Sequence, residues 1–144
     1  PKKLLINGDM FHSNYNSEFD EFANWKANYR KLKFILAKGN HDKHSEHLYE
    51  DLGIEVHTEY ESNQVCFIHD IQYYSKNKYP ITGHVHPGIG VYNKVKQKMK
   101  VPCFYFGEHY AILPAFSNFT GLQLIKPAVN DRVFAITPKA VIKF

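Results

Sequence analysis

The chain has 144 residues, of which 44% are hydrophobic, and a formal net charge of +4 at pH 7. This length and apolar content allow one sizeable core and exclude a disordered chain. No apolar run approaches the length of a membrane span, so we expect a cytoplasmic protein that has no membrane partner. The basic balance, with a pI near 9.0, fits a polyanionic partner without requiring one.

Short apolar runs that end in polar residues recur in the first part of the chain. The runs are residues 4–6, 34–37, 65–68 and 79–82. Each has the length of a buried strand and leads within a few residues to Asp, Asn or His. This construction is typical of an α/β sheet whose site lies in a crevice outside the carboxyl ends of its strands.

Two helices are predicted between these strands. Apolar side chains recur at spacings of three and four from Phe19 to Leu32, which predicts a covering helix over residues 17–32. A shorter helix is predicted over residues 45–52, because Gly53 can then supply a left-handed C-cap.

From Ile54 onward the pattern changes to strands separated by turn residues. The predicted strands are residues 55–61, 64–68, 88–93, 99–107, 110–115, 131–137 and 140–144. This order favours an α/β fold of two sheets packed face to face with helices outside, in a single domain over residues 1–144. Cys66 and Cys103 lie in strand-like runs, which predicts buried, reduced thiols.

The polar residues at the ends of the four apolar runs are the candidate site. They are Asp9, Asn40, His41, Asp42, His69, His84 and His86. Carboxylate, amide and imidazole donors without a thiolate suit Mn²⁺, Fe or Zn²⁺ in a catalytic setting better than a structural zinc site. In an extended segment, residues two apart point to the same side, so we expect His84 and His86 to converge on one crevice.

These residue types suit phosphate ester hydrolysis. Asp9 is the carboxylate placed to bridge two ions, and a bridged pair about 3.5 Å apart can share a hydroxide nucleophile and clamp a phosphoryl oxygen. His41 can protonate the leaving oxygen, with Asp42 fixing its tautomer. We therefore predict a metal-dependent phosphoesterase in which His41 and Asp42 are catalytic.

The motifs resemble those of the calcineurin-type metallophosphoesterase superfamily, in the same order and at strand ends. Residues 4–13, 81–88, 101–106 and 113–121 are similar to the DNA-ligase-associated metallophosphoesterases, a bacterial branch linked to DNA repair. The resemblance implies a four-layer α/β/β/α sandwich and a phosphodiesterase or nuclease that acts on DNA. It also implies DNA ligase and helicase-like repair proteins as partners.

The resemblance further implies a dinuclear centre, with Mn²⁺ as the expected metal. Asp9 would bridge the two ions, His86 would join one of them, and Asn40, His69 and His84 would complete the other. Asn40 and His41 would also contact the phosphate of the substrate.

One element of the superfamily pattern is missing from this sequence. Members begin with an Asp and a His two residues apart at the end of a first strand, and no residue before Leu4 supplies them. Either an amino-terminal segment is absent from this sequence or the protein has lost one ion. We expect a domain without its first strand, with one well-formed metal site in this chain and two in the complete protein. The unpaired sheet edge would favour homo-oligomers.

Two other functions remain open on the sequence alone. One is a generic phosphodiesterase for a small ester or a cyclic nucleotide, and the other is a scaffold that keeps the fold without turnover. His41 and Asp42 favour catalysis, because a scaffold has no use for a poised acid. The missing first motif is the feature that favours the scaffold.

Four lysines alternate with other residues, which would place their ammonium groups on one face of a strand. They are Lys94, Lys96, Lys98 and Lys100. Such a row can follow a phosphate backbone, which makes it a candidate contact for nucleic acid. Lysines on an exposed strand also discourage pairing between sheets, and the pattern leaves both roles open.

Overall fold

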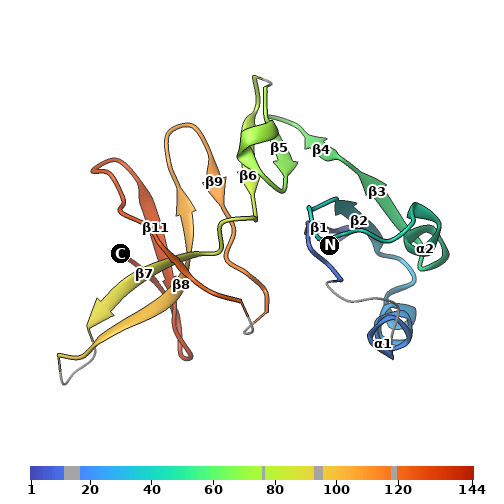
Figure 1. The fold of residues 1–144 in the computed structure, drawn as a ribbon, viewed down its shortest axis with the longest axis horizontal. Coiled ribbons are helices and arrows are strands. Elements are labelled where there is room, and N and C mark those ends of the chain that lie inside the picture. The colour runs from blue at the N-terminus through green and yellow to red at the C-terminus, as the bar shows by residue number, and fades with distance from the viewer. Residues whose placement is uncertain (12–16, 76, 93–95, 118–119) are drawn as a thin grey trace. The chain divides into compact units, whose positions relative to one another are not determined.

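A computed structural model describes residues 1–11, 17–75, 77–92, 96–117 and 120–144 (Figure 1). Within these residues the chain forms two compact units. The first comprises Pro1–Tyr60 with Phe67–His69, and the second comprises Glu61–Cys66 with Asp70–Phe144. The predicted mixed α/β class is confirmed, while the single domain stays a prediction. In the described part of the chain, no helix is long and apolar enough to cross a membrane.

The first unit is built on a parallel sheet with the strand order β1-β2-β3. Its elements are β1 (Lys3–Asn7), α1 (Ser17–Lys26), η1 (Ala27–Tyr29), β2 (Lys33–Ala37), α2 (Glu46–Asp51) and β3 (Ile54–His57). Parallel neighbours need crossover connections, which contain α1 between β1 and β2, and α2 between β2 and β3. Because Asn7 pairs with Ala37, the loops that leave β1 and β2 start at the same edge of the sheet.

The core of the first unit is aromatic. Phe19 of α1 and Phe34 of β2 are each 1% exposed, and Tyr49 of α2 is fully buried. Phe11 stacks on Phe19 with a ring-centroid distance of 4.0 Å. Residues 34–37 are all buried, which explains why the apolar run of β2 is continuous rather than alternating.

The helix predicted over residues 17–32 is too long. The α-helix ends at Lys26 and tightens into the 3₁₀ turn η1. The Asn28 amide donates to the carbonyls of Asn24 and Trp25 at 3.2 and 3.0 Å, which satisfies two carbonyls at the helix end. The shorter helix predicted over residues 45–52 agrees with α2, and Gly53 follows it with the left-handed φ of +66° expected of a C-cap.

The second unit contains most of a larger, mixed sheet. The elements from β4 onward are β4 (Glu59–Ser62), β5 (Val65–Ile68), η2 (Ile71–Tyr73), β6 (Tyr79–Thr82), β7 (Pro87–Tyr92), β8 (Lys98–Phe106), β9 (Ala111–Ile112), β10 (Gln123–Leu124), β11 (Arg132–Ile136) and β12 (Val141–Lys143). The first half of β4 and the second half of β5 belong to the first unit. The strand order is β10-β7-β8-β9-β6-β5-β4, with β11 joined to β8 and β12 joined to β11. The long antiparallel pair β7 and β8 is plain in Figure 1.

Two predicted strands differ from the structure, and a third strand was not predicted. The strand predicted over residues 55–61 is interrupted at Thr58, where β3 ends and β4 follows. The strand predicted over residues 110–115 shrinks to β9, since Pro114 has no N–H to continue the ladder. The sequence missed β10, a pair of exposed residues too short to show a periodicity.

The core of the second unit lies along β7, β8 and β11. It contains Ile89, Val101, Cys103, Val133 and Ala135. Cys103 and Cys66 are buried and reduced, as the sequence predicted. Burial raises the pKa of the Cys103 thiol to about 11.

The predicted row of four lysines does not lie in one strand. β8 begins at Lys98, and Lys96 lies in the preceding connection with a φ of 60°, where the alternation of an extended chain does not apply. Lys98 and Lys100 pair with residues of β7, and Lys100 is exposed. Lys94 lies outside the described residues. The shared lysine face is therefore wrong, and contact with nucleic acid stays a prediction.

Candidate metal centre

The loop after β1 turns through two residues with left-handed backbone. Gly8 has a φ of 81° and Asp9 a φ of 54°. Glycine adopts this conformation freely, whereas it costs an L-residue roughly 1–2 kcal/mol. Asp9 therefore needs support from neighbouring groups to hold its backbone in this turn.

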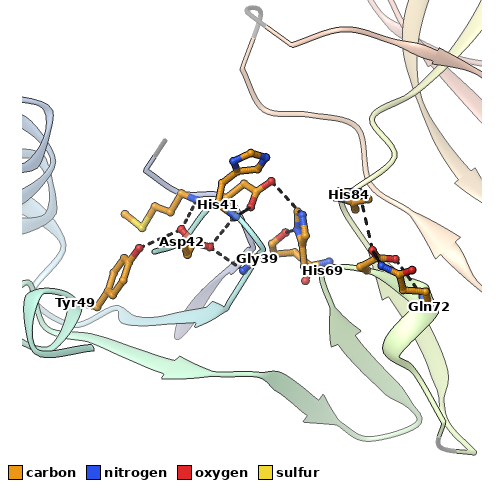
Figure 2. A network of polar contacts seen from close by, with 11 residues as sticks. Gly39, His41, Asp42, Tyr49, His69, Gln72 and His84 are labelled. Carbon is orange, nitrogen blue, oxygen red and sulfur yellow. Dashed lines mark hydrogen bonds and ion pairs between the residues drawn. The ribbon is translucent and has the colours of Figure 1, made fainter. Parts of the chain in front are cut away.

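Asp42, in the loop after β2, supplies that support (Figure 2). Its side-chain Oδ2 accepts hydrogen bonds from the main-chain N–H groups of Asp9 at 2.7 Å and Gly39 at 2.8 Å. Its Oδ1 accepts from the N–H of Met10 at 2.8 Å and from the Tyr49 hydroxyl at 3.2 Å. Asp42 is 2% exposed, so this buried carboxylate ties the two loops together.

The Asp9 carboxylate is held at both oxygens. Oδ1 accepts the main-chain N–H of His41 at 2.9 Å. Oδ2 lies 3.1 Å from Nε2 of His69, and both side chains are nearly buried. Asp9 and His69 thus come from loops 60 positions apart in sequence and meet within the first unit.

The other nitrogen of His69 fixes which ring atom faces Asp9. Nδ1 lies 2.9 Å from the main-chain oxygen of Asn7, and because a carbonyl only accepts, Nδ1 carries the proton. In the neutral ring, Nε2 then has a lone pair directed at the Asp9 carboxylate. Two lone pairs 3.1 Å apart repel each other, and a cation between them removes the repulsion. The donor set therefore fits a divalent metal ion.

Two glycines allow this close approach. A Cβ on Gly39 would lie 2.6 Å from the Asp9 nitrogen, and a Cβ on Gly8 would lie 2.9 Å from the Cβ of His69. Neither position has room for a side chain without displacing a residue of the Asp9–His69 pair. These glycines serve close backbone approach as well as turn geometry.

The second unit presents its own histidine and carboxylate. His84 lies in the turn after β6, and its Nε2 is 3.9 Å from Oδ2 of Asp70. The Asp70 carboxylate also accepts from the main-chain N–H and the side-chain amide of Gln72, at 3.1 and 2.6 Å (Figure 2). Asp70 is the residue that follows His69 in the chain.

The extended segment predicted for His84 and His86 is wrong. Residues 84–85 form a turn, and His86 has a φ of 51°, so the two side chains do not alternate as in a strand. The main-chain oxygen of His86 accepts from the N–H of Gln123, which begins β10. This bond joins a strand that the sequence did not reveal to the turn that carries both histidines.

The structure therefore groups part of the predicted site in the first unit. Asp9, His41, Asp42 and His69 form one network, while Asn40 lies in the exposed turn between Gly39 and His41. The contact predicted between Asp42 and the side chain of His41 stays a prediction. The Asp42 carboxylate accepts hydrogen bonds from three main-chain N–H groups and from the Tyr49 hydroxyl, and Asp42 is buried whereas His41 is exposed.

Sequence reasoning missed Tyr49. Its ring belongs to the aromatic core, and its hydroxyl contacts Asp42. A buried tyrosine hydroxyl usually has a hydrogen-bond partner, and Asp42 lies seven residues upstream. That requirement could have connected the two residues before the fold was known.

Comparisons with known proteins bear on the fold. No protein-family model and no curated protein sequence matches the chain. The crystal structure of the Pseudomonas putida nuclease MPE matches with a TM-score of 0.83 and 27% sequence identity, over 99% of this chain and 70% of that chain. The fold expected from the motifs is confirmed as that of a metallophosphoesterase-type nuclease, while the narrower DNA-ligase-associated family stays a prediction.

Proposed function

We propose that the protein is a metal-dependent phosphodiesterase that hydrolyses DNA. The observation that carries the proposal is the buried approach of the Asp9 carboxylate to Nε2 of His69, at 3.1 Å. The structural similarity of the chain to a nuclease supports hydrolysis of a phosphodiester as the reaction and nucleic acid as the substrate. A divalent ion would supply a nucleophile from water and offset the charge on the phosphoryl oxygens.

Asp9 and His69 are the two proposed ligands with the strongest support. We add His84 as the third ligand because the motif resemblance implies it. Asn40 and His86 complete the proposed set on the strength of the motif resemblance. Histidine and oxygen donors suit Mn²⁺, Zn²⁺ or Fe, and of these we propose Mn²⁺, which the motif resemblance favours.

His41 is the proposed acid for the leaving oxygen. Its main-chain N–H is bonded to the Asp9 carboxylate, while its side chain is exposed. The residue is thus anchored to a proposed ligand and its ring remains accessible to a substrate. A group in this position can give a proton to the departing alkoxide of a DNA strand.

The biological setting proposed for the protein is DNA repair. The support is the resemblance of the motifs to the DNA-ligase-associated metallophosphoesterases. A net charge of +4 is favourable for binding the phosphates of a DNA strand. DNA ligase and helicase-like repair proteins remain the proposed partners.

The test measures Mn²⁺-dependent hydrolysis of two substrates, an aryl phosphodiester with a nitrophenol leaving group and a fluorescent single-stranded oligonucleotide. Chelation and Asp9→Asn should abolish hydrolysis of both. His41→Ala should slow DNA cleavage about 100-fold or more, but should affect the aryl ester far less, because nitrophenolate leaves without a proton.

The control is His57→Ala, which removes another histidine of the first unit that contacts a carboxylate, Glu55 at 2.6 Å. This variant should keep full activity on both substrates. Hydrolysis that survives chelation, or that is equally fast in Asp9→Asn, would refute the proposal.

A further inference from the structure

We propose that Tyr49 is a positioning residue for the metal centre and acts on it through Asp42. Tyr49 is fully buried on α2, and its hydroxyl donates to Oδ1 of Asp42 at 3.2 Å. The inference rests on the proposed function, because it takes Asp9 to be a metal ligand.

The ring of Tyr49 is fixed by packing. Its centroid lies 6.2 Å from that of Phe11 at an interplanar angle of 24°, and it belongs to the same core cluster as Phe19 and Phe34. The hydroxyl therefore reaches Asp42 from a rigid base. Burial, together with the nearby Asp42 carboxylate, raises the pKa of Tyr49, so the hydroxyl stays protonated and can donate.

Asp42 passes this constraint to the site. The same carboxylate accepts the N–H groups of Asp9, Met10 and Gly39, at 2.7 to 2.8 Å. Of these, Asp9 has the strained backbone, with a φ of 54°. If the carboxylate of Asp42 turns, Asp9 loses the bond that holds its main chain, and its side chain loses its alignment with His69.

The chain provides a matched control. Tyr105 donates its hydroxyl to Oδ2 of Asp131 at 3.0 Å, and the same oxygen accepts the N–H of Ala128 at 2.7 Å. Tyr105→Phe therefore removes the same kind of bond, from a tyrosine to an aspartate that holds a backbone amide, within the second unit.

The experiment compares Tyr49→Phe with Tyr105→Phe by amide hydrogen exchange and by Mn²⁺ titration. Phenylalanine keeps the ring that packs the core, so both variants should fold. Tyr49→Phe should speed exchange at the amides of Asp9, Met10 and Gly39 about fivefold, as expected for the loss of one typical hydrogen bond. It should also weaken Mn²⁺ binding by about three- to tenfold.

Tyr105→Phe should leave the exchange of these amides and the Mn²⁺ affinity unchanged. The inference is overturned if the two variants behave alike at these three amides, or if Tyr49→Phe binds Mn²⁺ as tightly as the wild type. A wild-type protein that binds no Mn²⁺ would refute the proposed function, and the exchange rates alone would then decide whether Tyr49 holds these loops.

Discussion

At the scale of single residues, the carboxylates of Asp42 and Asp9 have different roles in the candidate site. Asp42 is buried and directs its oxygens at backbone N–H groups, so it supports the loops. Asp9 keeps one oxygen towards the His41 amide and the other towards His69. The type of residue alone does not separate these roles, since both are aspartates in the loops after parallel strands.

A methyl group at position 39 tests this arrangement. Gly39→Ala should lower Mn²⁺ affinity about tenfold or more, because its Cβ would meet the carboxylate and the main-chain nitrogen of Asp9. Titration of the variant with Mn²⁺ measures the effect. Gly121→Ala is the control, since a Cβ there meets nothing within 4 Å and should change nothing. Equal affinity in both variants would show that Asp9 can move without consequence.

The buried thiol of Cys103 makes the stability of the folded protein depend on pH in the alkaline range. Burial raises its pKa from 9.0 to about 11, so the folded state keeps a proton that the unfolded state releases. The contribution of the protonated thiol to the free energy of unfolding is fully present below pH 9 and is lost as the pH rises towards about 11. Urea unfolding across this range should give a falling midpoint, with a smaller fall in Cys103→Ala. An identical fall in both proteins would exclude the thiol as a cause.

At the scale of elements, the sequence predicts best where burial is uniform. Residues 34–37 are apolar without interruption, and they form a central strand buried on both faces. The sequence predicts the end of α1 less well. There the side-chain amide of Asn28 donates to two main-chain carbonyls, and the hydrophobic spacing does not reveal this cap. The turn at His84 and His86 was also missed, and the main-chain oxygen of His86 accepts from the N–H of Gln123 in β10, a strand that the sequence did not reveal.

The packing of α1 supports the loop that leads from Asp9. Phe19 is 1% exposed and stacks on Phe11, two residues after Asp9. Phe19→Ala should therefore destabilise the protein by about 3–5 kcal/mol, through lost burial and a cavity. Urea unfolding measures the change. Trp25→Ala, on the same helix but 43% exposed, should cost less than half as much. Comparable losses would mean that α1 packs through a different face.

At the scale of the whole molecule, the order of the polar segments along the chain predicted the fold better than the spacing within one motif predicted the local geometry. The four polar segments follow apolar strands, and this order, together with the motif resemblance, predicted the fold shared with a nuclease. The ring orientation of His69 was not predictable, because it depends on the main-chain oxygen of Asn7, which is 62 positions away. Tyr49 was missed although it lies seven residues from Asp42, because the need of a buried hydroxyl for a partner was not considered.

The central claim is that Asp9 and His69 hold a divalent cation, and calorimetric titration with Mn²⁺ tests it most directly. The wild-type protein should bind Mn²⁺, and His69→Ala should lower the affinity at least about tenfold. His57→Ala, which removes a histidine that faces Glu55 instead, should bind as the wild type does. Unchanged affinity in His69→Ala, or an equal loss in His57→Ala, would contradict the claim.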